Sequence, residues 1–224
     1  YMASRGEYLN SKILAAYLGF AFIDAADCIH FDESGKLDND ATDEGIYLAL
    51  KNIEYAVIPG FYGSLPDGTV HTFSRGGSDI TGSLVARAVR ADMYENWTDV
   101  SGMLSADPRI VDDPEPIDAI TYRELRELSY MGASVMHEAA VFPVRKANIS
   151  MNIKNTNRPE DNGTLISAEL PRIPRKRKVA GIAGKKGFSA VLVETPSMNE
   201  EIGFGARLLN IFARHKVNFE HLPT

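Results

Sequence analysis

Apolar residues recur at helical spacing near the start of the chain. Leu9, Ile13 and Tyr17 share one stripe of a helix predicted over residues 7–18, and Gly19 supplies a stop signal. The same spacing predicts further helices, at residues 44–52, 78–90, 122–129, 133–145 and 203–215. Short apolar runs bounded by turn residues predict strands, at residues 20–23, 55–58, 69–73, 93–97, 149–154, 164–167, 179–183, 189–194 and 217–220. Because strands alternate with helices, we predict an α/β architecture with a largely parallel sheet.

Three segments interrupt this pattern. Residues 32–43 are polar and indicate an exposed loop, and residues 101–117 form a long proline-containing loop of the kind that is usually functional. Residues 171–178 carry two prolines and five basic residues, which favours a solvated linker on an acidic chain over the alternative, a nuclear-import or polyanion-binding patch. We therefore predict one domain over residues 1–170 and a second over residues 179–224.

The overall charge narrows the possible partners. The sequence has 24 Lys and Arg against 30 Asp and Glu, a formal net charge of -6, so no general field draws it to nucleic acid or to an anionic membrane. The apolar stretches are shorter than the roughly 20 residues that a bilayer crossing needs, and the first residues lack a basic and apolar leader. We expect a cytoplasmic protein with neither nucleic acid nor a membrane as its main partner.

Cysteine and histidine are too sparse for common metal sites. Cys28 is the single cysteine, which excludes an internal disulfide and a multi-cysteine zinc site. The pair His137-Glu138 is not a zinc-protease motif, because Val141 stands where the second histidine is required. We expect no metal held by thiolates or histidines.

A pair of glycines opens directly into a predicted helix after a predicted strand. Gly76 and Gly77 allow a ligand to approach the backbone closely, and the N–H groups of the first helical turn form an anion site. Arg75 adds a partner for a carboxylate or phosphate, and Asp79 is suited to hold an amine or to orient a metal. The alternative is that Ser78 caps the helix and the glycines only form a turn. The residues by themselves leave both interpretations open.

A second polar cluster follows the strand predicted at residues 93–97. Thr98 and Asp99 leave this strand, and Asp107 and Arg109 close the loop after it. Polar groups at the carboxyl end of a strand are well placed for a ligand, although Asp107 before proline is also ordinary turn chemistry. A third segment, residues 131–137, is a glycine-containing entry to a helix.

Taken in order, these segments resemble the aspartate kinases of the amino-acid kinase family. The resemblance covers nearly the whole chain and is carried by residues 5–7, 57–61, 74–79, 97–99 with 106–109, and 131–135. It implies a three-layer αβα sandwich of the amino-acid kinase type, incomplete at its N-terminus, followed by a partial ACT-like unit of the ferredoxin-type α+β class.

The resemblance implies a reaction and the residues that carry it. ATP, with Mg²⁺, would donate its γ-phosphoryl group to the side-chain carboxylate of L-aspartate, giving 4-phospho-L-aspartate for lysine, threonine and methionine synthesis. By family analogy, Arg75 and Asp79 are the catalytic residues, and the aspartate site consists of Glu7, Arg75, Ser78 and Asp79. The same analogy assigns the nucleotide to Gly76, Gly77, Thr98, Asp99, Asp107, Arg109 and Ser134.

The tail resembles the opening of an ACT regulatory domain. The resemblance implies an effector amino acid, lysine or threonine, near Met198, Gly203, Phe204 and Glu220. It also implies a homodimer or a larger assembly.

The sequence departs from the aspartate kinase pattern at identifiable places. These residues contain no Lys-Phe-Gly-Gly-Ser type of loop, Ser134 stands where many relatives have lysine, and Leu104 where some have tyrosine. We therefore expect weak activity from these 224 residues by themselves. Two alternatives stay open: another amino-acid kinase, acting on glutamate or acetylglutamate, and a non-catalytic regulatory polypeptide that binds lysine or threonine.

Overall fold

The structure is a computed structural model that describes residues 1–130, 136, 138–170, 179–196, 198 and 200–222. The chain forms two compact units, Tyr1–Lys185 and Lys186–Thr224. The linker predicted at residues 171–178 lies outside the described residues.

The first unit begins with a long helix and a small parallel sheet. Helix α1 (Met2–Leu18) ends at Gly19, whose left-handed conformation (φ 70°, ψ 24°) suits glycine, so the predicted stop is confirmed. The helix begins at Met2, earlier than the predicted start at residue 7. Strand β1 (Ala21–Phe22) pairs in parallel with β2 (Ala56–Val57), and α1 packs on both strands.

Helix α2 (Asn39–Leu50) begins earlier than its apolar pattern suggested. The Asp38 carboxylate accepts a hydrogen bond from the Ala41 N–H at 3.1 Å and so caps the helix. The expectation of a loop up to residue 43 was therefore wrong over its last residues. Between β1 and α2 lies a short 3-10 helix, η1 (Ala25–Asp27).

A hairpin leads into the next helix. Strands β3 (Tyr62–Ser64) and β4 (Val70–Thr72) pair in antiparallel fashion, and helix α3 (Gly77–Ala88) follows. The strand β3 was not predicted from the sequence, because three residues with glycine in the middle show no apolar alternation.

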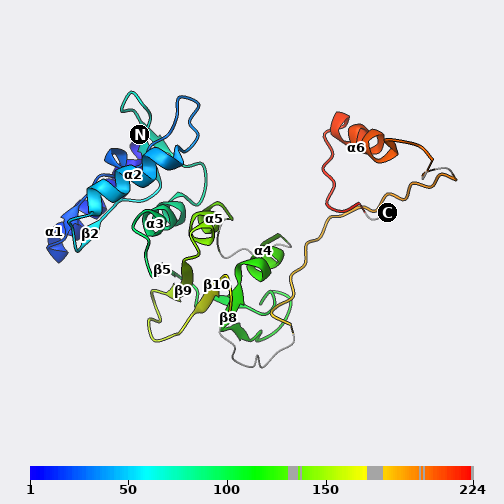
Figure 1. Ribbon diagram of the computed structural model, residues 1–224. Coiled ribbons are helices and arrows are strands. Elements are labelled where there is room, and N and C mark those ends of the chain that lie inside the picture. Colours follow the sequence, from blue (N-terminus) through cyan, green and yellow to red (C-terminus); the bar gives the residue numbers. More distant parts are fainter. Residues whose placement is uncertain (131–135, 137, 171–178, 197, 199, 223–224) are drawn as a thin grey trace. The chain divides into compact units, whose positions relative to one another are not determined.

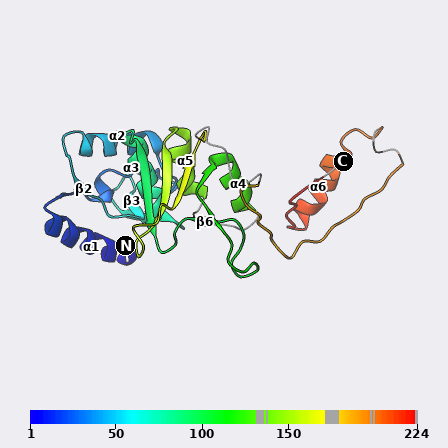
Figure 2. The same cartoon turned by 90° about the horizontal axis from the view of Figure 1, so that it is seen from below.

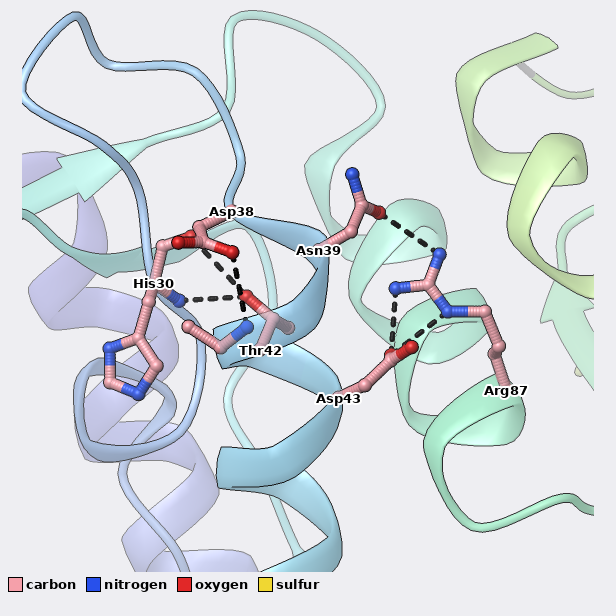
Figure 3. Close-up of polar contacts among 7 residues, drawn as sticks. His30, Asp38, Asn39, Thr42, Asp43 and Arg87 are labelled. Atoms are coloured by element: carbon pink, nitrogen blue, oxygen red, sulfur yellow. Dashed lines mark hydrogen bonds and ion pairs between the residues drawn. The ribbon is translucent and has the colours of Figure 1, made fainter.

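Arg87, in the last turn of α3, fastens this helix to α2 (Figure 3). Its guanidinium donates to Asp43 Oδ1 from Nε at 2.9 Å and from Nη2 at 2.7 Å, and to Asn39 Oδ1 from Nη1 at 3.0 Å. On the far side of α2, Thr42 Oγ1 accepts a hydrogen bond from the His30 N–H at 3.0 Å. Helix α2 is thus held on two sides by polar contacts.

The larger sheet has four strands in the order β5-β9-β10-β8. They are β5 (Met93–Thr98), β9 (Ser150–Asn155), β10 (Thr164–Ser167) and β8 (Ala119–Thr121). Pairing is parallel between β5 and β9 and between β8 and β10, as predicted. Strands β9 and β10 are antiparallel, because the short connection 156–163 leaves no room for the crossover that parallel neighbours need.

Helices cover one face of this sheet. Helix α3 lies beside α5 (Glu138–Lys146), and both contact the strands (Figure 1, Figure 2). The side chains of Leu84, Val144, Met151 and Ile153 are fully buried there. Helix α4 (Tyr122–Tyr130) packs on β8 and β10, and the two short strands β6 (Met103–Leu104) and β7 (Pro116–Ile117) pair within the predicted long loop.

The C-terminal part of the chain contains one of its predicted elements. Helix α6 (Phe204–Arg214) is confirmed, whereas the described residues form no strand at 179–183, 189–194 or 217–220. Apolar alternation favours a strand but forms one only where a neighbouring strand accepts its backbone hydrogen bonds. Here Leu192 is 83% exposed, and the Ile182 N–H donates to the Ser105 main-chain oxygen at 2.8 Å and not to a neighbouring strand.

Among the described residues, no helix is both long enough and apolar enough to cross a membrane.

Candidate active site

The N-terminus of α3 is built around the two glycines singled out in the sequence. Gly76 has the left-handed conformation (φ 61°, ψ 24°) and forms the N-cap, and the helix begins at Gly77. A Cβ atom at Gly77 would lie 2.6 Å from the Phe61 Cβ and 2.9 Å from the Phe73 Cβ. Both positions therefore require glycine, one for its backbone angles and the other for lack of space.

The loop after β2 closes against this helix. Phe61 adopts a positive φ of 63°, its N–H donates to Thr81 Oγ1 at 3.1 Å, and its oxygen accepts from the Phe73 N–H at 2.9 Å. A Cβ atom at Gly60 would lie 2.9 Å from Ser78 Oγ. Two segments noted separately in the sequence, residues 57–61 and 74–79, thus form one site.

Asp79 lies in the first turn of α3 and is held from β5. Asn96 Nδ2 donates to Asp79 Oδ1 at 2.9 Å, and the Tyr94 hydroxyl donates to the Asp79 main-chain oxygen at 3.2 Å. Neither Tyr94 nor Asn96 was selected from the sequence. The signal that could have found them is the alternation of β5, which directs both side chains to the face that carries Thr98.

Arg75 and Ser78 are exposed next to the helix N-terminus. Arg75 lines a cleft of about 620 Å³, whose wall includes Phe73, Ile80 and Phe142. An exposed guanidinium beside free N–H groups of a helix provides positive charge for an anionic ligand.

Thr98 is the last residue of β5, one residue beyond the predicted end of the strand, and Asp99 follows it. Thr98 Oγ1 donates to Asp99 Oδ1 at 3.3 Å, and the Thr98 main-chain oxygen accepts from the Thr156 N–H at 2.8 Å. Thr98 lies two residues beyond Asn96 on the same face, about 7 Å along the strand. Strand β5 therefore connects Thr98 and Asp99 to the site at α3.

Asp107 and Arg109 pair with each other. Arg109 donates to Asp107 Oδ1 from Nε at 2.9 Å and to Oδ2 from Nη2 at 2.7 Å, and these bonds lower the pKa of the Asp107 carboxyl to about 2. Because Arg109 is 85% exposed, an incoming phosphate has access to its guanidinium.

Glu7 is exposed on α1, two residues after Arg5, which belongs to a cluster that the sequence analysis did not select. Arg5 lies over the Tyr62 ring, 5.3 Å from its centre, and the Tyr62 hydroxyl donates to Asp24 Oδ1 at 2.7 Å. Burial raises the pKa of Tyr62, so this hydroxyl keeps its proton. Asp24 follows β1, and the acidic residue after an apolar run is the signal that could have identified it.

Several expected site residues belong elsewhere. Ser134 lies outside the described residues. Met198, Gly203, Phe204 and Glu220 belong to the second unit, where Gly203 (φ 81°) is the N-cap of α6. Within the described residues there is no group of three or more His, Cys, Asp or Glu side chains that could hold a metal ion.

The arrangement can bind an anion beside an ammonium group. The N–H groups at the start of α3 and Arg75 attract negative charge, while Asp79 offers a carboxylate within the same turn. Such a site suits a zwitterion or an amino acid next to a phosphate.

The model of the amino acid kinase family matches residues 1–155. The chain is 39% identical to aspartokinase 3 of Bacillus subtilis, over 98% of this chain and 50% of that protein. It is 32% identical to the lysine-sensitive aspartokinase 3 of Escherichia coli, over 79% of this chain and 39% of that protein.

Solved structures give the same result. The aspartate kinase of Clostridium acetobutylicum matches with a TM-score of 0.85 and 51% identity, over 100% of this chain and 51% of that one. E. coli aspartokinase III in complex with aspartate and ADP matches with a TM-score of 0.75 and 26% identity, over 99% of this chain and 51% of that one. The expected amino-acid kinase fold is thereby confirmed.

The chain spans about half the length of these relatives. The family model alone covers more than half of the chain. The chain belongs to the amino acid kinase family.

Proposed function

We propose that the chain is part of an aspartate kinase, which transfers the γ-phosphoryl group of ATP to the side-chain carboxylate of L-aspartate. The observation that carries this proposal is the contact between Asp79, at the N-terminus of α3, and Asn96 on β5. It joins the carboxylate that would bind the amine, at the start of α3, to the strand that ends at Thr98, just before Asp99. A relative solved with aspartate and ADP supports this substrate pair.

The aspartate site would use opposite charges to orient its substrate. Arg75 would bind a carboxylate of aspartate, and Asp79 and Glu7 its amine. The N–H groups near Gly76, Gly77 and Ser78 would border the transferring phosphate, where negative charge is favoured. Phosphoryl transfer needs mainly such positioning and charge neutralisation, and no covalent intermediate.

The nucleotide would lie at the end of β5. Thr98 and Asp99 would contact it directly, and Arg109 would exchange part of its pairing with Asp107 for phosphate oxygens. Ser134 belongs to this proposal by family analogy alone. Mg²⁺ would arrive with ATP, bound mainly by phosphate oxygens and water, and would neutralise their charge.

The second unit would regulate the reaction. We retain the division into residues 1–170, a linker at 171–178 and an ACT-like part at 179–224, with an effector near Met198, Gly203, Phe204 and Glu220. Lysine is the first effector to test, because one relative is named lysine-sensitive and one structure of E. coli aspartokinase III contains lysine; threonine is the second. A cytoplasmic homo-oligomer fits this proposal.

Aspartate-dependent release of ADP from Mg-ATP tests the proposal, with the full-length protein as the enzyme and glutamate as the control substrate. We expect turnover of aspartate and not of glutamate, and a loss of about a hundredfold or more in kcat/KM in Arg75→Ala. Arg123→Ala, an exposed arginine on α4, is the matched control. Absence of ADP release from the parent protein would refute the assignment and favour the regulatory polypeptide.

A further inference from the structure

Two side chains of β5 form a closed set of hydrogen bonds around Asp79. Asn96 Nδ2 lies 2.9 Å from Asp79 Oδ1 and 3.1 Å from Tyr94 Oη. Tyr94 Oη lies 3.2 Å from the main-chain oxygen of Asp79. Both the side chain and the backbone of Asp79 are therefore fixed from the same strand.

The chemistry of these groups determines which atom donates each hydrogen bond. A carboxylate only accepts, so the nitrogen of the Asn96 amide faces Asp79, and its two hydrogens match the two acceptors. Tyr94 then donates its own hydrogen to the Asp79 carbonyl. Burial raises the pKa of Tyr94 to about 12, so this donor keeps its hydrogen at any physiological pH.

The set is held close to the helix. A Cβ atom at Gly82, one turn after Asp79, would lie 2.7 Å from Tyr94 Oη. The absence of a side chain at Gly82 therefore lets α3 approach β5 closely enough for these bonds.

One carboxylate oxygen is left for a ligand. Asn96 engages Oδ1, and no other described residue donates a hydrogen bond to Oδ2 of Asp79. A carboxylate with one oxygen fixed has lost its freedom to rotate, so less entropy is lost when the second oxygen binds an ammonium group.

We propose that Asn96 is a positioning residue that orients Asp79 toward the amine of the bound amino acid and so gives the site its preference for an α-amino dicarboxylate. The inference rests on the proposed function. It adds to that function a residue outside the aspartate and nucleotide sites expected from the sequence.

The test compares aspartate with succinate, which has both carboxylates but no amine. In the full-length protein, Asn96→Leu removes the donor at similar volume. We expect the KM for aspartate to rise about tenfold, as for the loss of one hydrogen bond to a charged group. The inhibition constant of succinate, measured in competition with aspartate, and the KM for ATP should change by less than about twofold.

Three further proteins complete the experiment. If Asn96→Leu lowers the yield of folded protein, Asn96→Val replaces it in the same measurement. Valine also lacks the donor, and its β-branched side chain suits a strand. Asn96→Ser, which keeps a donor, should recover part of the affinity for aspartate. Asn52→Leu, at an exposed asparagine after α2, is the matched control.

The outcomes separate the two proposals. A selective loss of aspartate affinity supports the role of Asn96. An unchanged KM for aspartate, or equal losses for aspartate and succinate, would overturn that role and leave the kinase assignment intact. A parent protein that releases no ADP with aspartate would overturn both.

Discussion

An alanine at Gly77 tests the close contact on which the site depends. The added Cβ would meet Phe61 Cα at 2.7 Å and the Cβ atoms of Phe61 and Phe73 at 2.6 and 2.9 Å. These are backbone and near-backbone atoms, so no side-chain rotation removes the overlap. The loop of residues 59–61 has to move away from α3 by several tenths of an ångström or more.

The size of the effect follows from two opposing contributions. Replacing glycine by alanine in a helix stabilises by about 0.5–1 kcal/mol, whereas overfilling a packed contact costs about 1–3 kcal/mol. Gly77 is the first residue of α3, whereas Gly6 lies inside α1, where a Cβ atom meets nothing within 4 Å. We therefore expect Gly6→Ala to stabilise and Gly77→Ala to destabilise.

Thermal unfolding measures this difference directly. At about 2–4 °C per kcal/mol for a chain of this size, Gly77→Ala should lower Tm by several degrees, and Gly6→Ala should raise it slightly. If the proposed function holds, the displaced loop should also lower kcat/KM for aspartate by about tenfold to a hundredfold.

Two results would refute the reasoning. One is a Gly77→Ala protein with the same gain in Tm as Gly6→Ala, which would mean that Phe61 and Phe73 yield without cost. The other is a destabilised Gly77→Ala protein with unchanged aspartate kinetics, which would separate the helix N-terminus from the reaction.

Three further predictions concern parts of the first unit outside this contact. Arg87→Ala should lower the free energy of unfolding by about 1–2 kcal/mol, a value between those of exposed and buried ion pairs. The reason is that the Arg87 side chain is 11% exposed and the Asp43 side chain 40% exposed. An unchanged denaturant midpoint would contradict this expectation. Cys28 is fully buried and burial raises its pKa to about 12, so a thiol reagent at pH 8 should label it only after unfolding, and rapid labelling of the native protein would be inconsistent with the fold. Hydrogen bonds from Arg109 lower the pKa of Asp107 from 3.8 to about 2, so their contribution to stability is present above about pH 4 and lost as pH falls through about 2; Arg109→Ala should return the pKa, followed by NMR, toward 3.8.

The local pattern of the sequence predicted helices and strands correctly where interactions between residues close in the sequence determine them. The end of α1 before Gly19 and the bounds of β5 and β9 were predicted to within one residue, whereas α1 begins at Met2 and not at residue 7. The start of α2 was missed although its cap, Asp38, is visible in the sequence. Residues 39–43 were assigned to a loop because few of them are apolar. The helix begins there nevertheless, because the Asp38 cap binds a backbone N–H group and does not depend on apolar side chains.

The strands expected after residue 178 show the limit of such patterns. Apolar alternation around Leu192 predicted a strand, but a strand needs a partner that local sequence does not specify. The direction of β10 depends likewise on its pairing with β9.

The sequence by itself determined the class of the fold, the family and the motifs that carry charge, because glycines at a helix start and charged residues after strands are local features. Only the tertiary structure brought Gly60 against Ser78, joined Asp79 to Asn96 across 17 residues of chain, and tied Arg87 to Asp43. These contacts connect different elements, and their distances depend on how closely the helices approach the sheet. Buried packing sets that approach, and it involves the whole unit rather than any one segment.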